Sequence, residues 1–377
     1  MEAIRTRSFA RAGLLGNPSD GYFGKTVSFT FTQFGVDLVL TESSRIRFYQ
    51  GEVDDATFSS AEELVKNLRL YGYYGGIRLL KAVSKRFFEY CLAHDIAVPD
   101  RNFSVEYKIN IPRLVGLSGS SAICSAMLKA LMKFYEVEIP IEYQPTICLE
   151  AERDELGINC GFQDRVIQIY NGLVFMDFER AFVEAHNHGR YEQLLPRLPS
   201  PERLNLYVAY DAQRAEESGK AHQRVKRLFE QKNADVLAAM SEFADIAQQG
   251  RDLLVAADQL KSEVEVEQRN DKIHSSTSTV NFNSRLAELI NANFDLRDRI
   301  FNVAEENRRM VMTARKSGAS AKFAGSGGAI VGTYQDEAQF ERLKADLAAI
   351  GTVALIPTIA TSGDESVASD IASWRNS

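Results

Sequence analysis

The letters GLSGSS at residues 116–121 stand directly before an apolar pattern that predicts a helix at about residues 121–135. Glycines let a backbone turn tightly and approach a ligand closely, and the start of a helix offers free N–H groups and a positive dipole end. The serine hydroxyls add donors and a candidate ligand for Mg²⁺. These features together predict a phosphate cradle, and a plain turn with a serine N-cap explains the same residues.

Three other loop motifs fit this stretch less well. A P-loop is excluded because no Lys-Ser or Lys-Thr pair follows the second glycine. The dinucleotide fingerprint is absent, and Glu138 is a weak candidate for its ribose ligand. GLSGS does match the G-x-S-x-G pattern of an acyl-transferring serine, with Ser118 at the centre. However, His222 and His274 lie in helical or loop contexts with no supporting aspartate pattern.

The acids that a phosphoryl-transfer site needs follow in residues 150–172, on two predicted helices separated by a glycine turn. Such a site requires oxygen ligands for Mg²⁺ and a group that orients or deprotonates the acceptor hydroxyl. Asp164 stands near the start of the second helix, so it is either an acid of the first helical turn or a pocket acid. The remaining acids fit a solvated helix face as well as a metal site: Glu150, Glu152, Asp154 and Glu155.

Strand and helix patterns alternate in both halves of the chain. Strands are predicted near residues 25–40, 103–112, 172–178 and 203–211, and helical patterns near residues 61–92, 121–135, 145–157, 161–170, 219–260, 285–301 and 306–318. We place a polar linker at residues 186–201 and a charged loop or helix extension at residues 261–284. Because 377 residues exceed what one hydrophobic core usually supports, the pattern predicts an α+β fold of two domains, residues 1–195 and 196–377.

Charge and composition exclude several kinds of partner. A net charge of −7 without long Lys/Arg runs does not fit a nucleic-acid-binding protein, so an anion must be held locally. No apolar run is long enough to cross a bilayer, and the N-terminus lacks a signal-peptide pattern. The four cysteines form no C-x-x-C pair, which is typical of reduced thiols. We expect a cytoplasmic monomer or homodimer with no membrane or nucleic-acid partner.

Three motifs resemble the signatures of the GHMP kinases, a family of ATP-dependent kinases that act on small molecules. PRLVGLSGSSA, which starts at Pro112, is similar to the second signature, P-x-x-x-G-L-x-x-S-S-A. FARAGLLGNPSD at residues 9–20 resembles the first signature, and KFAGSGGAIVG at residues 322–332 resembles the third. Within this family the chain is most similar to the glucuronokinases, from about residue 7 to residue 334, with a poorer match near residues 256–280.

The resemblance implies a fold and a reaction. The fold would join an N-terminal domain like domain 2 of ribosomal protein S5 to a ferredoxin-like C-terminal domain, with the active site in the cleft between them. The reaction would transfer the γ-phosphoryl group of ATP, with Mg²⁺, to the anomeric hydroxyl of D-glucuronate. A kinase for galacturonate, galactose, arabinose or a heptose, and a sugar sensor without activity, remain as alternatives.

The resemblance also implies a role for each motif. Asp164 would orient or deprotonate the sugar hydroxyl, and Arg11 would stabilise the transferring charge and lower the pKa of Asp164. Ser121 and Glu152 would hold Mg²⁺. The backbone of the second motif would bind ATP: Pro112, Gly116, Leu117, Ser118, Gly119, Ser120 and Ser121. The sugar would contact the first and third motifs and one arginine: Asn17, Ser19, Asp20, Arg297, Gly325, Ser326 and Gly327.

Substrate choice depends on the carboxylate of a uronic acid, for which a bidentate arginine is the natural partner. Arg78 and Arg297 are the candidates, and each also fits a surface helix. The tyrosines of YGYYGG at residues 71–76 would stack on a sugar or adenine, or pack between helices. Ser118 stands where a glycine is commoner in the second signature, and we expect its φ to be negative because a side chain is tolerated there.

Overall fold

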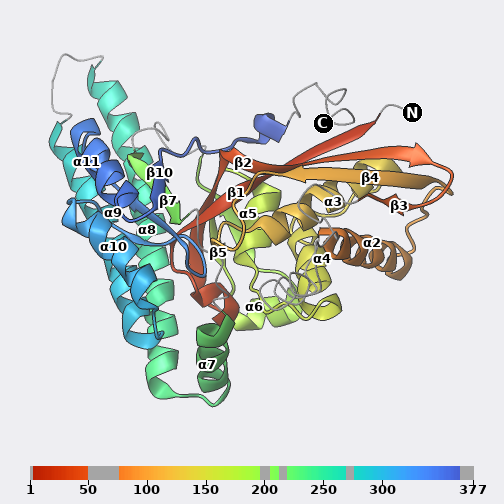
Figure 1. Ribbon diagram of the computed structural model, residues 1–377, viewed down its shortest axis with the longest axis horizontal. Helices are drawn as coiled ribbons and strands as arrows, with labels where there is room; N and C mark the ends of the chain where they lie inside the picture. Colours follow the sequence, from red (N-terminus) through yellow and green to blue (C-terminus); the bar gives the residue numbers. More distant parts are fainter. Residues whose placement is uncertain (1–2, 50–75, 196–203, 212–218, 269–275, 366–377) are drawn as a thin grey trace, which may run out of the picture.

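The computed structural model of the protein describes residues 3–49, 76–195, 204–211, 219–268 and 276–365. Figure 1 shows a long sheet across one side of the molecule with helices beneath it, and a second group of helices packed at the other end. The first sheet and the helices beneath it come from the N-terminal half of the chain, and the second group of helices comes from the C-terminal half.

The first sheet has the order β3-β4-β2-β5-β6, and β1 also pairs with β2. Its strands are β1 (Ile4–Leu15), β2 (Lys25–Ser43), β3 (Arg47–Phe48), β4 (Asn102–Ile109), β5 (Leu173–Asp177) and β6 (Arg190–Gln193). β1 and β2 run antiparallel, with register shifts between Phe9 and Ala10 and between Gly13 and Leu15. Such irregularities bend a strand and re-aim its side chains, and Arg11 lies between the two shifts.

The helices of the N-terminal half pack around α3, the helix predicted to follow the glycine loop. They are α2 (Gly76–Ala93), α3 (Gly119–Tyr135), α4 (Gln144–Glu150), α5 (Gln163–Tyr170) and α6 (Arg180–His186). α3 is apolar on most faces and buries most of its length against β1, β2 and α2, as such a helix must. The helix predicted after residue 144 breaks into α4 and a π-helical turn, η3 (Ala151–Glu155), and turns of this type are frequent at functional sites.

The second sheet confirms the ferredoxin-like prediction. Its strands are β7 (Leu206–Asp211), β8 (Lys322–Phe323), β9 (Ala329–Thr333) and β10 (Thr352–Leu355), in the order β10-β7-β9-β8 and antiparallel throughout. Its helices are α7 (Gly219–Glu230), α8 (Ala234–Gln268), α9 (Ser276–Ile300), α10 (Glu305–Lys316) and α11 (Glu337–Ala348). Strand, helices, two strands, helix and strand, in the spatial order 4-1-3-2, make a split β-α-β arrangement.

One sequence prediction needs correction. The stretch at residues 186–201 is not all linker, because β6 lies in it and pairs with β5. The segment at residues 261–284, predicted as a charged loop or a helix extension, is helical in its described part, since α8 continues to Gln268 and α9 begins at Ser276. The domain boundary at residue 195 falls between β6 and β7 and stays a prediction. The tyrosines at residues 71–74 lie outside the described residues.

The chain returns to the first sheet after β10. The Thr32 N–H donates to the carbonyl of Thr358 at 2.9 Å, and the Ala360 N–H donates to the carbonyl of Thr30 at 2.9 Å. Phe31 and Ile359 form a bridge between these bonds. The C-terminal half therefore ends against β2 of the N-terminal half.

The sequence predicted reduced cysteines and no segment that crosses a membrane. The four cysteines are free thiols, and three of them are buried. Among the described residues no helix combines the length and the apolar character that a bilayer crossing demands.

Candidate active site

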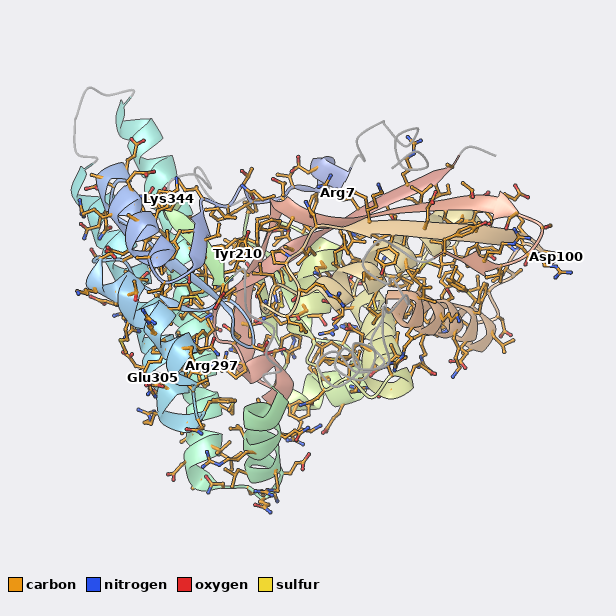
Figure 2. The ribbon with its side chains drawn as sticks, viewed as in Figure 1. Arg7, Asp100, Tyr210, Arg297, Glu305 and Lys344 are labelled. Carbon is orange, nitrogen blue, oxygen red and sulfur yellow. The ribbon has the colours of Figure 1, made fainter. Side chains whose placement is uncertain are left out.

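A cavity of about 1040 Å³ lies between the two halves of the molecule. Its walls come from the first motif, the glycine loop, the start of α5, α7 and the third motif. Arg297 on α9 contributes from the C-terminal half, and Figure 2 shows it where the C-terminal helices face the first strands. A concave site of this size accommodates a nucleotide and a small second substrate.

The predicted phosphate cradle faces this cavity. Six of the seven predicted ATP-binding residues line it: Pro112, Gly116, Leu117, Ser118, Gly119 and Ser120. The loop leads into the N-terminus of α3, whose free N–H groups favour an anion. Gly116 has a φ of +74°, and a Cβ there would lie 2.6 Å from the carbonyl oxygen of Gly327. The second and third motifs therefore touch through their backbones, which requires glycine at this position.

Arg11 connects the three motif regions. Its Nε donates to Oδ1 of Asp164 at 2.7 Å, and one terminal nitrogen donates to the carbonyls of Gly116 at 2.6 Å and Ala324 at 2.9 Å. The Arg11 residue is buried, so these charge-assisted bonds form away from bulk water. The structure thus brings Arg11 and Asp164 together, as predicted from residues 153 positions apart.

Asp164 is held as an anion. Its Oδ2 accepts a hydrogen bond from the Ser118 hydroxyl at 2.7 Å and lies 3.7 Å from a guanidinium nitrogen of Arg165. Burial alone would raise the pKa of Asp164, but Arg11, Arg165 and the Ser118 bond outweigh burial and lower the pKa to about 2. Asp164 therefore presents a full negative charge to the cavity at neutral pH.

Ser118 corrects one sequence prediction. Its φ is +65° and its ψ is +46°, the left-handed region, although the sequence predicted a negative φ. A serine in this region is strained by an amount of order 1 kcal/mol. The hydroxyl bond to Asp164 holds the residue in this conformation, and the sequence alone does not reveal that partner.

Asp20 is a second carboxylate in the cavity wall, on the 3-10 turn η1 (Ser19–Tyr22). Its Oδ2 accepts a bond from the backbone N–H of Gln163 at 3.3 Å. Burial and the nearby Asp164 charge raise the pKa of Asp20 to about 6. Ser19, predicted to contact the sugar, does not line the cavity: its hydroxyl is buried and donates to the carbonyl of Lys25 at 2.9 Å.

The predicted metal ligands lie behind the cavity wall. Ser121 and Glu152 are both fully buried and are not lining residues. Glu152 accepts two bonds at Oε2 from Arg165, one of them from Nε at 2.7 Å, whereas its buried Oε1 has no hydrogen-bond partner in the described part of the chain. An unpartnered carboxylate oxygen fits the hard oxygen ligand that Mg²⁺ prefers, so these residues are compatible with the predicted role.

Of the remaining residues predicted to contact the sugar, all but one line the cavity. Asn17, Arg297, Gly325 and Ser326 line the cavity, and Gly327 does not. Arg297 donates to the carbonyl of Gly325 at 2.8 Å and to that of Ser326 at 3.0 Å, so it braces the third motif. Burial lowers the pKa of Arg297 to about 10, where the side chain is still charged at neutral pH.

The structure separates the two arginines that were candidates for a carboxylate. Arg78 is exposed on α2 and is not one of the residues that line the cavity. Arg297 is buried in the cavity wall. Position therefore favours Arg297.

Three polar residues that brace the site were missed by sequence reasoning. Lys322 is buried and donates to the carbonyls of Gly13 at 2.6 Å and Phe323 at 2.8 Å, and to Oδ1 of Asn17. Asn293 donates to the carbonyl of Asn17 at 3.1 Å, and Arg165 bonds Glu152. Arg165 directly follows Asp164 and Lys322 opens the third motif, so adjacency to a motif was the available signal.

The fold and this cavity define a kinase of small molecules, in which a glycine loop at a helix N-terminus faces an Arg–Asp pair. Comparison with known proteins agrees. The family model for the GHMP kinases N terminal domain matches residues 78–172. The Lactococcus lactis galactokinase complexed with galactose superimposes with a TM-score of 0.65 at 14% identity, over 95% of this chain and 94% of that chain, which shows a shared fold.

Two curated relatives are much more similar. Glucuronokinase 1 of Arabidopsis thaliana is 40% identical over 335 residues, which are 87% of this chain and 84% of the relative. Probable glucuronokinase 2 of the same plant is 40% identical over 370 residues, 95% and 93% of the two chains. The chain therefore belongs to the GHMP kinase family, in the group of the glucuronokinases. The predictions of family, of fold and of an ATP-dependent kinase are confirmed.

The contact between Gly116 and the third motif yields a first prediction. Gly116→Ala should lower the free energy of unfolding by more than about 1 kcal/mol and reduce kcat/KM for ATP at least about tenfold, because the methyl group collides with the Gly327 backbone. Gly351→Ala is the matched control: Gly351 has a φ of +80° but no atom within 4 Å of the added Cβ. Thermal unfolding and ATP kinetics should separate the two variants, and equal effects would contradict the contact.

The raised pKa of Asp20 yields a second prediction. A carboxyl whose pKa rises from 3.8 to about 6 on folding destabilises the protein increasingly as the pH rises through that interval. In Asp20→Asn the free energy of unfolding relative to the wild type should therefore increase by about 1–3 kcal/mol between pH 4 and pH 7.5. Urea unfolding at several pH values measures this difference.

A second carboxylate provides the control for Asp20. A hydrogen bond from Arg153 lowers the pKa of Asp154 from its usual value of 3.8, so the stability that this charge contributes is lost only as the pH falls below about 4. The free energy of unfolding of Asp154→Asn relative to the wild type should therefore stay nearly constant between pH 4 and pH 7.5. A difference between Asp20→Asn and the wild type that does not vary with pH would contradict the assignment for Asp20.

Proposed function

We propose that the protein transfers the γ-phosphoryl group of ATP to the anomeric hydroxyl of D-glucuronate and releases glucuronate 1-phosphate and ADP. The observation that carries this proposal is the Arg11–Asp164 pair at the mouth of the glycine loop, in a cavity walled by both halves. The 40% identity to the Arabidopsis glucuronokinases supports the choice of sugar.

Catalysis in this proposal depends on positioning and charge. The sugar oxygen forms a bond to the γ-phosphorus, the bond from that phosphorus to ADP breaks, and the hydroxyl proton leaves toward Asp164. The backbone N–H groups at the start of α3 hold the phosphates, and Arg11 opposes the negative charge that develops between the substrates. No covalent enzyme intermediate is required.

Mg²⁺ is part of the proposal. Glu152, through its unpartnered Oε1, and Ser121, through its hydroxyl, would hold the ion. When bound, it would neutralise charge on the phosphate oxygens of ATP. Arg165 fixes the Glu152 carboxylate by a buried ion pair, so it would set the direction of that ligand.

The sugar site would combine three kinds of group from the cavity wall. The Asp20 carboxylate accepts hydrogen bonds from sugar hydroxyls, and the Asn17 amide can donate or accept. Arg297, buried in the cavity wall, would supply a positive charge for the uronate carboxylate. A cytoplasmic monomer or homodimer stays a prediction.

An assay of ADP release with ATP and Mg²⁺ tests the proposed reaction against glucuronate, galacturonate, glucose, galactose and arabinose. Turnover on glucuronate alone is the expected result. Turnover mainly on another sugar would keep the kinase and replace the substrate. ATP binding without turnover on any sugar would favour the sensor alternative.

Asp164→Asn should leave ATP binding nearly unchanged and reduce kcat by about a hundredfold or more, because the acceptor hydroxyl loses its charged partner. Steady-state kinetics and calorimetric ATP titration measure the two effects. Asp154→Asn removes a carboxylate of the same chain segment that is exposed and bonded to Arg153, and it should retain wild-type turnover. Near-normal turnover of Asp164→Asn would refute the role of Asp164.

Arg297→Ala should raise the Kd for glucuronate at least about tenfold more than the Kd for a neutral sugar such as glucose, because only the uronate pairs with the guanidinium. The exposed Arg78 offers the matched control, and Arg78→Ala should change neither Kd, as measured by calorimetric titration. Equal losses for both sugars in Arg297→Ala would remove the carboxylate role and leave a bracing role for this arginine.

A further inference from the structure

Ser118 occupies a strained position at the centre of the site. It is the N-cap residue of α3 with left-handed backbone angles, and its side chain makes no capping bond to the helix. Its hydroxyl donates instead to Oδ2 of Asp164 at 2.7 Å, across 46 positions of sequence. A hydroxyl that gives up its capping role and keeps a strained backbone has another function.

The backbone of Ser118 is fixed from two sides. Its carbonyl accepts a bond from Nε2 of Gln168 on α5 at 2.9 Å and from the Ser121 hydroxyl at 3.3 Å. The residue therefore joins α3, which presents the phosphate cradle, to α5, which carries Asp164. Any change in the angle between these helices would act on the Ser118–Asp164 bond.

The carboxylate of Asp164 is held at both oxygens. Arg11 bonds Oδ1 at 2.7 Å and Ser118 bonds Oδ2 at 2.7 Å, so the plane of the carboxylate is defined by two donors on different elements. With the Arg11 bond alone, the carboxylate could rotate about its χ2 torsion, which has broad energy wells. The carboxylate must lie within hydrogen-bond distance of the sugar hydroxyl to take its proton, so this rotation affects the reaction.

We propose that Ser118 is a positioning residue for the acceptor side of the reaction: its hydroxyl fixes the orientation of the Asp164 carboxylate toward the sugar. This inference rests on the proposed function and refines it. In the sequence analysis Ser118 was grouped with the ATP-binding residues; here only its backbone belongs to the phosphate cradle. Its bond is also one of the contacts that keep the pKa of Asp164 low.

Two substitutions separate the hydroxyl from the backbone strain. Ser118→Ala removes the hydroxyl and keeps a side chain at positive φ, whereas Ser118→Gly removes the hydroxyl and relieves the strain. Both should reduce kcat by a similar factor, about tenfold, and leave KM for ATP within about twofold of the wild type. The glycine variant should be the more stable of the two, so it carries the test if the alanine variant folds poorly.

The coupling between Ser118 and Asp164 provides a readout that a general loss of structure would not move. The Ser118→Gly change should have no further effect on kcat in an Asp164→Asn background, because the two residues act as one unit.

Several results would overturn this role. A rise in KM for ATP with an unchanged kcat would assign the hydroxyl to the phosphates instead. Wild-type kcat in Ser118→Gly, or a full additional loss in the double variant, would also reject it. Failure of the proposed function is distinguishable, since the wild type itself would then show no turnover on glucuronate.

Discussion

The arrangement of this site depends on the side chain of Arg11. Its guanidinium bonds Asp164 on α5, the carbonyl of Gly116 in the phosphate loop and the carbonyl of Ala324 in the third motif. Buried groups of this kind must have partners, because an unpaired buried charge costs several kcal/mol. One residue on a bent strand therefore fixes the three segments relative to one another, although the first and the last of them are more than 150 positions apart in the sequence.

Two carboxylates in one cavity behave differently because of their neighbours. Burial dominates at Asp20 and raises its pKa, whereas cations and a hydroxyl dominate at Asp164 and lower its pKa. Asp20 is thus the carboxyl whose protonation changes near pH 6, and Asp164 keeps its charge throughout the physiological range. Like charges at close range disfavour double ionisation, and the surrounding arginines decide which carboxyl keeps the charge.

The sequence predicted features that depend on local patterns. The glycine loop and the helix after it follow from contiguous letters, whereas the pairing of Arg11 with Asp164, 153 positions apart, was implied by the resemblance of the motifs to a known family. β6 was missed because its residues are polar and only partly buried at the edge of a sheet, so they lack apolar alternation. The φ of Ser118 and the burial of Lys322 depend on partners from distant segments, which one sequence does not reveal.

The return of the chain at residues 358–360 has a topological consequence. The chain starts in the first sheet, builds the second sheet and comes back, so the second sheet with its helices is an insertion between two segments of the first unit. If one of the two chain connections between the sheets were cleaved, the other connection would still join the two units. Phe31, fully buried next to that crossing, would gain solvent exposure if the first unit were produced alone. The two units are thus joined by two chain connections, and we expect them to assemble as one folding unit.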